Sequence, residues 1–100
     1  MPEYLPILHL LASRSSDVLA CCRAQAGDKD TVVLIGDGVL LLASPVIPES
    51  IESERPLACL EADVNARGLG ATADVSGIER LKDSDMVRLM TQHQHCLTWK

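Results

Sequence analysis

Two adjacent cysteines, Cys21 and Cys22, carry the most distinctive chemistry in this sequence. A thiolate in a partly exposed, electropositive place can act as a nucleophile or accept and pass on a sulfane sulfur. Arg23 follows directly, but adjacent side chains of a helix point about 100° apart, so its help to either thiol does not follow from the spacing. On a helix, Cys22 falls on the apolar face with Val18 and Ala26, where free cysteine is commonly a small buried residue. Cys21 lies to one side of that face, so the pair is either a thiol site or partly core.

A second group of potential ligands lies near the end of the chain, at His93, His95 and Cys96. Imidazole and thiolate bind zinc, but residues packed this closely cannot easily supply separated tetrahedral vertices, and no second cluster accompanies them. We therefore expect no metal and no other cofactor. We interpret His93 as lying at the end of a helix, near its negative pole.

The motif Gly36-Asp37-Gly38 follows an apolar run rich in β-branched residues. Doubly wound sheets bind ligands at the carboxyl ends of their strands, so this turn could face a ligand. The glycine motifs of nucleotide-binding loops are absent, and a tight turn that needs glycine conformations explains the same residues. Asp63, Arg67 and Gly68 fit a short helix with an acid at its start, a base at its end and a left-handed glycine cap. No Ser-His-Asp or paired-carboxylate arrangement can be defended from spacing alone.

Composition narrows the remaining classes of function. With 100 residues, 47% of them hydrophobic, the chain is expected to form one domain over 1–100. A net charge of -5 argues against direct binding of nucleic acid. No run of about 18 apolar residues predicts a membrane span, and the start carries Glu3 and two prolines instead of a basic signal-peptide region. The cysteines lack Cys-x-x-Cys spacing, which favours reduced thiols in the cytoplasm.

Strands and helices are expected to alternate along the chain. Apolar runs predict strands over 4–11, 31–35, 56–60 and 96–99, with a further strand around Val75. Helices are expected over 18–26, 39–43, 64–67 and from Asp83 or Ser84 to 94, the last with Met86, Val87, Leu89 and Met90 on its inner face. The proline-rich segment 44–56 is typical of a loop. This order predicts a three-layer α/β fold with a mostly parallel sheet of about five strands.

Taken together, these pieces resemble the DsrH/TusB family of sulfur-relay subunits over nearly the whole chain. The matching elements are, in order, Leu8-His9, Asp37-Gly38-Val39, Asp63-Val64-Asn65-Ala66-Arg67-Gly68, Asp85-Met86-Val87-Arg88-Leu89, His93 and Trp99. None is specific alone, but their order and spacing are. The resemblance implies a DsrE/DsrF/DsrH-like fold and a place in a heterohexamer with a TusC/DsrF-like and a TusD/DsrE-like subunit.

The resemblance also implies a role in passing persulfide sulfur towards thiolation of the tRNA wobble uridine, through a downstream acceptor protein and without direct contact to nucleic acid or membrane. Because the principal active cysteine of such complexes belongs to the TusD/DsrE-type subunit, this chain would be a largely structural, accessory member. The cysteine position of the family falls on Cys22, which makes Cys22 the expected persulfide carrier and Cys21 the second choice. Two alternatives stay open, a DsrH-type subunit in dissimilatory sulfur oxidation and an independent thiol or redox protein that uses both cysteines.

Overall fold

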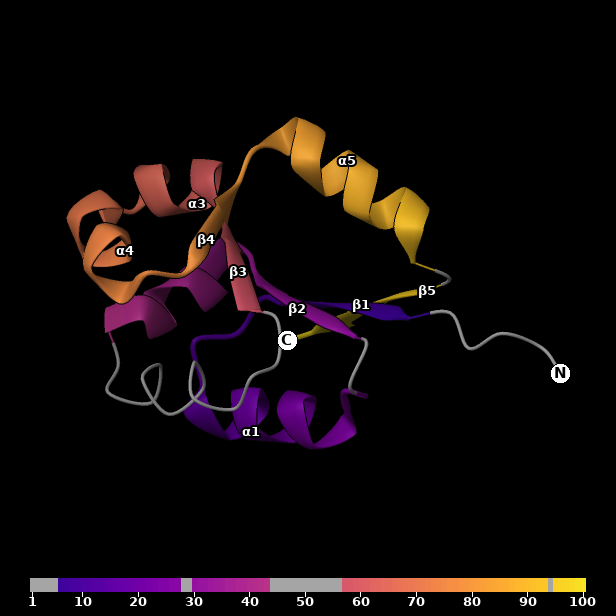
Figure 1. Ribbon diagram of the computed structural model, residues 1–100. Helices are drawn as coiled ribbons and strands as arrows, with labels where there is room; N and C mark the ends of the chain where they lie inside the picture. The colour runs from indigo at the N-terminus through magenta and orange to yellow at the C-terminus, as the bar shows by residue number, and fades with distance from the viewer. Residues whose placement is uncertain (1–5, 28–29, 44–56, 94) are drawn as a thin grey trace, which may run out of the picture.

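The structure is a computed structural model that describes residues 6–27, 30–43, 57–93 and 95–100 (Figure 1). Its elements are, in order, β1 (Ile7–Leu11), α1 (Ser16–Gln25), β2 (Thr31–Leu34), the 3-10 helix η1 (Gly36–Ala43), β3 (Leu57–Leu60), α3 (Glu61–Ala66), α4 (Gly70–Ser76), β4 (Glu79–Leu81), α5 (Asp83–Gln92) and β5 (His95–Trp99). The loop expected over 44–56 and the first residues of the expected strand 4–11 lie outside the described residues.

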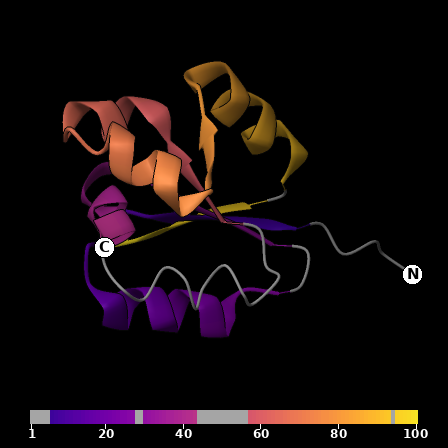
Figure 2. The same cartoon turned by 60° about the vertical axis from the view of Figure 1, so that its left-hand side comes forward.

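The sheet has five strands in the order β4-β3-β2-β1-β5, and every neighbouring pair is parallel. The apolar strand β2 occupies the centre, as a continuous run of Val and Leu predicts for a strand covered on both faces. Figure 1 shows α1 on one side of the sheet and α5 on the other, and Figure 2 shows the same three layers from another direction. The predicted three-layer α/β fold with a parallel sheet of about five strands is thus confirmed.

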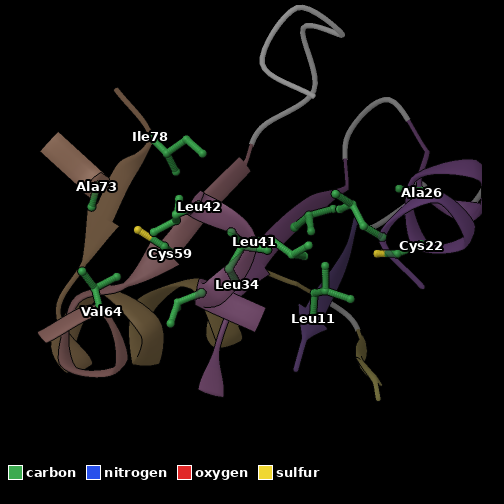
Figure 3. Packing of buried hydrophobic residues seen from close by; sticks show 13 residues of the cluster. Leu11, Cys22, Ala26, Leu34, Leu41, Leu42, Cys59, Val64, Ala73 and Ile78 are labelled. Carbon is green, nitrogen blue, oxygen red and sulfur yellow. The ribbon is translucent and has the colours of Figure 1, made fainter. Parts of the chain in front are cut away.

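Successive side chains of each strand point to opposite faces, so the sheet separates two apolar clusters. The larger one joins α1 to η1, α3 and α4 across Leu11, Leu34 and Cys59 (Figure 3). The smaller one lies on the other face, where Leu8, Val33, Ala58 and Leu81 are packed by Met86 and Leu89 of α5. Most of the helices therefore pack against the larger cluster, whereas α5 packs against the smaller one.

The strand expected around Val75 is wrong, because this segment forms helix α4. The N–H of Ala73 donates to the carbonyl oxygen of Leu69 at 2.8 Å, which starts the helix, and Ala73 faces the core. Val75 then points outward and is 90% exposed. Gly77, at φ 71°, ends the helix in the left-handed conformation, and the strand begins later, at Glu79.

The last helix was placed correctly, but its inner face and its cap differ from the expectation. Met86 and Leu89 pack against the sheet, whereas Val87 is 62% and Met90 48% exposed. The N-cap is Lys82, whose backbone N–H donates to the carboxylate of Asp85 at 3.0 Å. Only part of the apolar stripe of α5 thus packs against the sheet.

Gly38 has no room for a side chain, because a Cβ at this position would overlap the carbonyl oxygen of Leu11. That oxygen also accepts the N–H of Ile35 at 3.0 Å, which holds the ends of β1 and β2 together. We expect Gly38→Ala to lower the free energy of unfolding by about 1–3 kcal/mol, the usual cost of overpacking, measured by urea denaturation. Gly70→Ala is the matched control, since nothing lies near its Cβ, and equal stability of the two variants would contradict this account.

Candidate functional site

Helix α1 separates the two adjacent cysteines. The helix begins after Ser15, whose hydroxyl oxygen accepts the N–H of Val18 at 3.4 Å. From this start, Cys22 lies on the inner face beside Leu19 and is fully buried, whereas Cys21 is exposed. Figure 3 shows Cys22 projecting from α1 into the core on the side of Leu11. The predicted burial of Cys22 is confirmed.

Burial also changes the chemistry of Cys22. Desolvation raises the pKa of its thiol to about 11, and the positive charge of Arg23 opposes this only in part. Little thiolate is therefore present near neutral pH, and the thiolate is the nucleophilic form. Of the two neighbours, Cys21 is the one that a reactant can reach.

Cys21 opens onto a cavity of about 420 Å³ between α1 and the strands β1 and β5. The lining residues are Ile7, His9, Cys21, Ala24, Gln25, Leu97 and Trp99. Most of these side chains are apolar or aromatic, as is usual for a small-molecule or peptide pocket. The sequence alone did not indicate this cavity, because it forms only when β5 pairs with β1.

A chain of hydrogen bonds between side chains joins Trp99 and His9, which line the cavity, to the buried Asp30. The indole Nε1–H of Trp99 donates to Nδ1 of His9 at 3.0 Å, and Nε2 of His9 lies 3.0 Å from the carboxylate of Asp30. Because the indole nitrogen can only donate, His9 accepts at Nδ1 and carries its proton on Nε2, from which it donates to Asp30. His9 and Asp30 are almost fully buried.

The carboxylate of Asp30 is the centre of this chain. Besides His9, it accepts the backbone N–H of Ile7 and that of Gly27, each at 2.9 Å. These bonds satisfy a carboxylate that would otherwise be costly to bury. In the sequence, His9 and Trp99 were identified only as matches to the family, and Asp30 was missed. The only sign of Asp30 was its position as an acidic residue directly before a buried strand.

The carboxyl ends of β2 and β3 carry a second polar cluster. Asp63 accepts the N–H of Gly36 at 2.8 Å, and Arg67 lies 3.1 Å from Asp37 and 3.7 Å from Asp63. Gly36 has φ 51° and Gly68 has φ 66°, so both adopt the left-handed conformation. The interpretation of these motifs as a tight turn and a glycine-capped helix is confirmed. The polar groups of this cluster bond to one another across the turn.

The His93, His95 and Cys96 group is not gathered into one place. Nδ1 of His93 donates to the carbonyl oxygen of Leu89 at 2.6 Å, and its Nε2 lies 3.3 Å from the hydroxyl of Thr31. His93 thus ends α5, as predicted, while His95 and Cys96 point to opposite faces of β5. Within the described ranges, no three His, Cys, Asp or Glu side chains could hold a metal ion.

No helix among the residues that the structure describes is long and apolar enough to cross a membrane.

The fold and its motifs define a small three-layer α/β domain of the DsrH/TusB type. A family model described as DsrH like protein matches residues 12–96. The chain therefore belongs to the DsrH family. The matched range contains both cysteines of α1 and all the quoted motifs except Leu8-His9 and Trp99. No curated protein matches the chain.

Replacing Trp99 by Phe tests the buried chain of hydrogen bonds. The variant keeps an aromatic ring but leaves Nδ1 of His9 without its donor, which should cost about 1–3 kcal/mol of the free energy of unfolding. Thr98→Val, on the same strand and exposed, is the matched control and should change stability by less than about 0.5 kcal/mol. Chemical denaturation followed by circular dichroism measures both, and a loss no larger than that of the control would argue against the bond.

Thiol alkylation tests the separation of the cysteines. With iodoacetamide at pH 8, the folded protein should be modified at Cys21 and Cys96 and protected at Cys22 and Cys59, because burial raises the pKa of both protected thiols. Tandem mass spectrometry locates the label within the peptide that contains both cysteines of α1. The unfolded protein, labelled at all four positions, is the control. Equal rates at Cys21 and Cys22 would show that α1 is not seated as described.

Proposed function

We propose that this chain is a subunit of a sulfur-relay complex that passes persulfide sulfur towards thiolation of the tRNA wobble uridine. In this proposal it assembles in the cytoplasm with a TusC/DsrF-like and a TusD/DsrE-like subunit in a heterohexamer and is largely structural. Membership of the DsrH family supports the assembly. The net charge of -5 is consistent with a tRNA that is reached through a downstream acceptor protein and not by this chain.

The accessory role expected for Cys22 passes to Cys21 in this proposal. The observation that carries it is the exposure of Cys21 at the apolar cavity beside Leu97 and Trp99, while Cys22 is buried with a raised pKa. In this proposal the apolar side chains of the cavity lie beside a persulfide on Cys21.

The sulfur transfer itself needs no external oxidant. The Cys21 thiolate attacks the terminal sulfur of a partner's cysteine persulfide, and a new bond forms between Sγ of Cys21 and that sulfur. The S–S bond of the partner breaks, and its cysteine leaves as a thiolate that takes the electron pair. The reverse step, onto an acceptor thiolate, releases Cys21 unchanged.

The independent redox alternative is weaker on geometric grounds. A disulfide requires two sulfur atoms about 2.05 Å apart, with Cβ atoms at roughly 3.5–4.5 Å. Cys21 faces the cavity and Cys22 the core, so α1 would have to unwind to join them. A role in dissimilatory sulfur oxidation uses the same assembly and chemistry with another acceptor, and adjacent sulfite reductase genes would favour it.

Co-expression with a TusC/DsrF-like and a TusD/DsrE-like chain from the same organism tests the assembly. We expect all three chains to purify together, and cells that lack this chain to lose wobble-uridine thiolation, measured by mercury-gel retardation of tRNA. Purification of this chain alone from the co-expressing cells would contradict the proposal.

The accessory thiol is tested separately in the same complex. After incubation with a persulfide donor, Cys21→Ser should remove the persulfide detected on this chain by mass spectrometry, whereas Cys22→Ser should retain it. Cys96→Ser is the control for an exposed thiol outside the cavity. A persulfide that survives Cys21→Ser but not Cys22→Ser would restore the role to Cys22.

A further inference from the structure

The two edges of the sheet differ in length and charge. The edge strand β4 has three residues, and two of them, Glu79 and Arg80, are charged. Arg80 also forms an ion pair with Asp74 of α4 and donates to the carbonyl oxygen of Gly70 at 3.3 Å. Short, charged edges are a common defence against pairing with other chains. The β4 edge is thus protected.

The opposite edge, β5, carries none of these protections. Its five residues, His95 to Trp99, include no Asp, Glu, Lys, Arg or Pro. The first four are exposed, and Leu97 is 45% exposed. Within the described part of the chain, β1 is its only strand neighbour. A strand of this kind presents a row of backbone donors and acceptors ready for a further strand.

The register of β5 shows which groups face outward. The carbonyl oxygen of Trp99 accepts the N–H of Ala12 at 2.8 Å, so the backbone groups of Trp99 point towards β1. In a parallel pair the orientation alternates from residue to residue, so those of Leu97 and His95 also point towards β1. The N–H and C=O groups of Cys96 and Thr98 therefore point away from the sheet.

We infer that β5 pairs with β5 of a second copy of this chain, antiparallel about a two-fold axis at Leu97. In this register Cys96 of one copy exchanges both of its backbone hydrogen bonds with Thr98 of the other, and the same exchange repeats across the axis. All outward groups of Cys96 and Thr98 are then satisfied. Two five-stranded sheets become one continuous sheet.

The side chains fit the same two-fold pairing. Leu97 meets Leu97 of the second copy in a non-hydrogen-bonded pair, where side chains approach most closely, and Trp99 lies opposite His95 on the same face. The charges favour this edge as well. Each copy carries a net charge of -5, so two copies repel overall and can approach most easily along a strand without acidic residues.

Sedimentation velocity over a concentration series of the full chain tests the pairing. We expect a reversible monomer–dimer equilibrium that Leu97→Lys abolishes, because two lysines would meet at the axis. Thr98→Pro, which removes an outward N–H only, should abolish it too. Val87→Lys is the matched control, since Val87 is also an exposed aliphatic residue but lies on α5, and it should leave the dimer intact. Circular dichroism confirms that each variant is folded.

A disulfide trap defines the register. In a Cys21→Ser/Cys96→Ser background, Leu97→Cys should give a disulfide-linked dimer under mild oxidation, because Cα atoms of a non-hydrogen-bonded pair lie about 4.5 Å apart. Val87→Cys in the same background is the control for random collision. A monomer at all concentrations, or equal cross-linking of the two variants, would overturn the inference. It does not depend on the sulfur-relay proposal, since it is measured on the isolated chain.

Discussion

One half of the sheet depends on the hydrogen bonds that the buried carboxylate of Asp30 accepts. It accepts hydrogen bonds from Ile7 and His9 of β1, more than 20 residues earlier in the chain, and from Gly27 just after α1. Through His9 it also fixes the indole of Trp99 and hence the end of β5. Removal of such a group would leave buried N–H donors without partners, which is more costly than the loss of one ordinary hydrogen bond. The wall of the cavity beside Cys21 is therefore set by a residue that does not line it.

The other half of the sheet is held by the polar cluster at the carboxyl ends of β2 and β3. Asp63 binds the N–H of Gly36, and Arg67 joins Asp63 to Asp37. Gly38 lies so close to Leu11 that no side chain fits, which brings β1 into the same junction. These contacts give a physical reason for the acid, glycine and arginine residue types in the family motifs. They stabilise the turn between β2 and η1.

The sequence predicted those features that depend on local pattern and failed on those that depend on distant contacts. Continuous apolar runs such as Thr31–Leu34 marked the parallel strands, and helical periodicity placed Cys22 on the inner face of α1. Val75 was misplaced because one apolar residue in a short segment cannot distinguish a strand from the outer face of a helix. Asp30 was missed because its role depends on its contacts with Ile7 and His9 and, through His9, on Trp99. Pairing of β5 with β1 creates the cavity and brings Trp99 to His9, and no local pattern encodes that pairing.

Adjacency gives the two cysteines of α1 opposite environments. A rotation of about 100° per residue separates them, so a helix whose inner face is fixed by Leu19 and Cys22 must turn Cys21 away from the core. Exposure of Cys22 would require rotation of α1, which would withdraw Leu19 from the core and bring Cys21 inside. The core packing of α1 thus decides which of the two thiols is accessible. The family position alone cannot decide it, because one step along the helix is the difference between a thiol buried with a raised pKa and one at the mouth of a cavity.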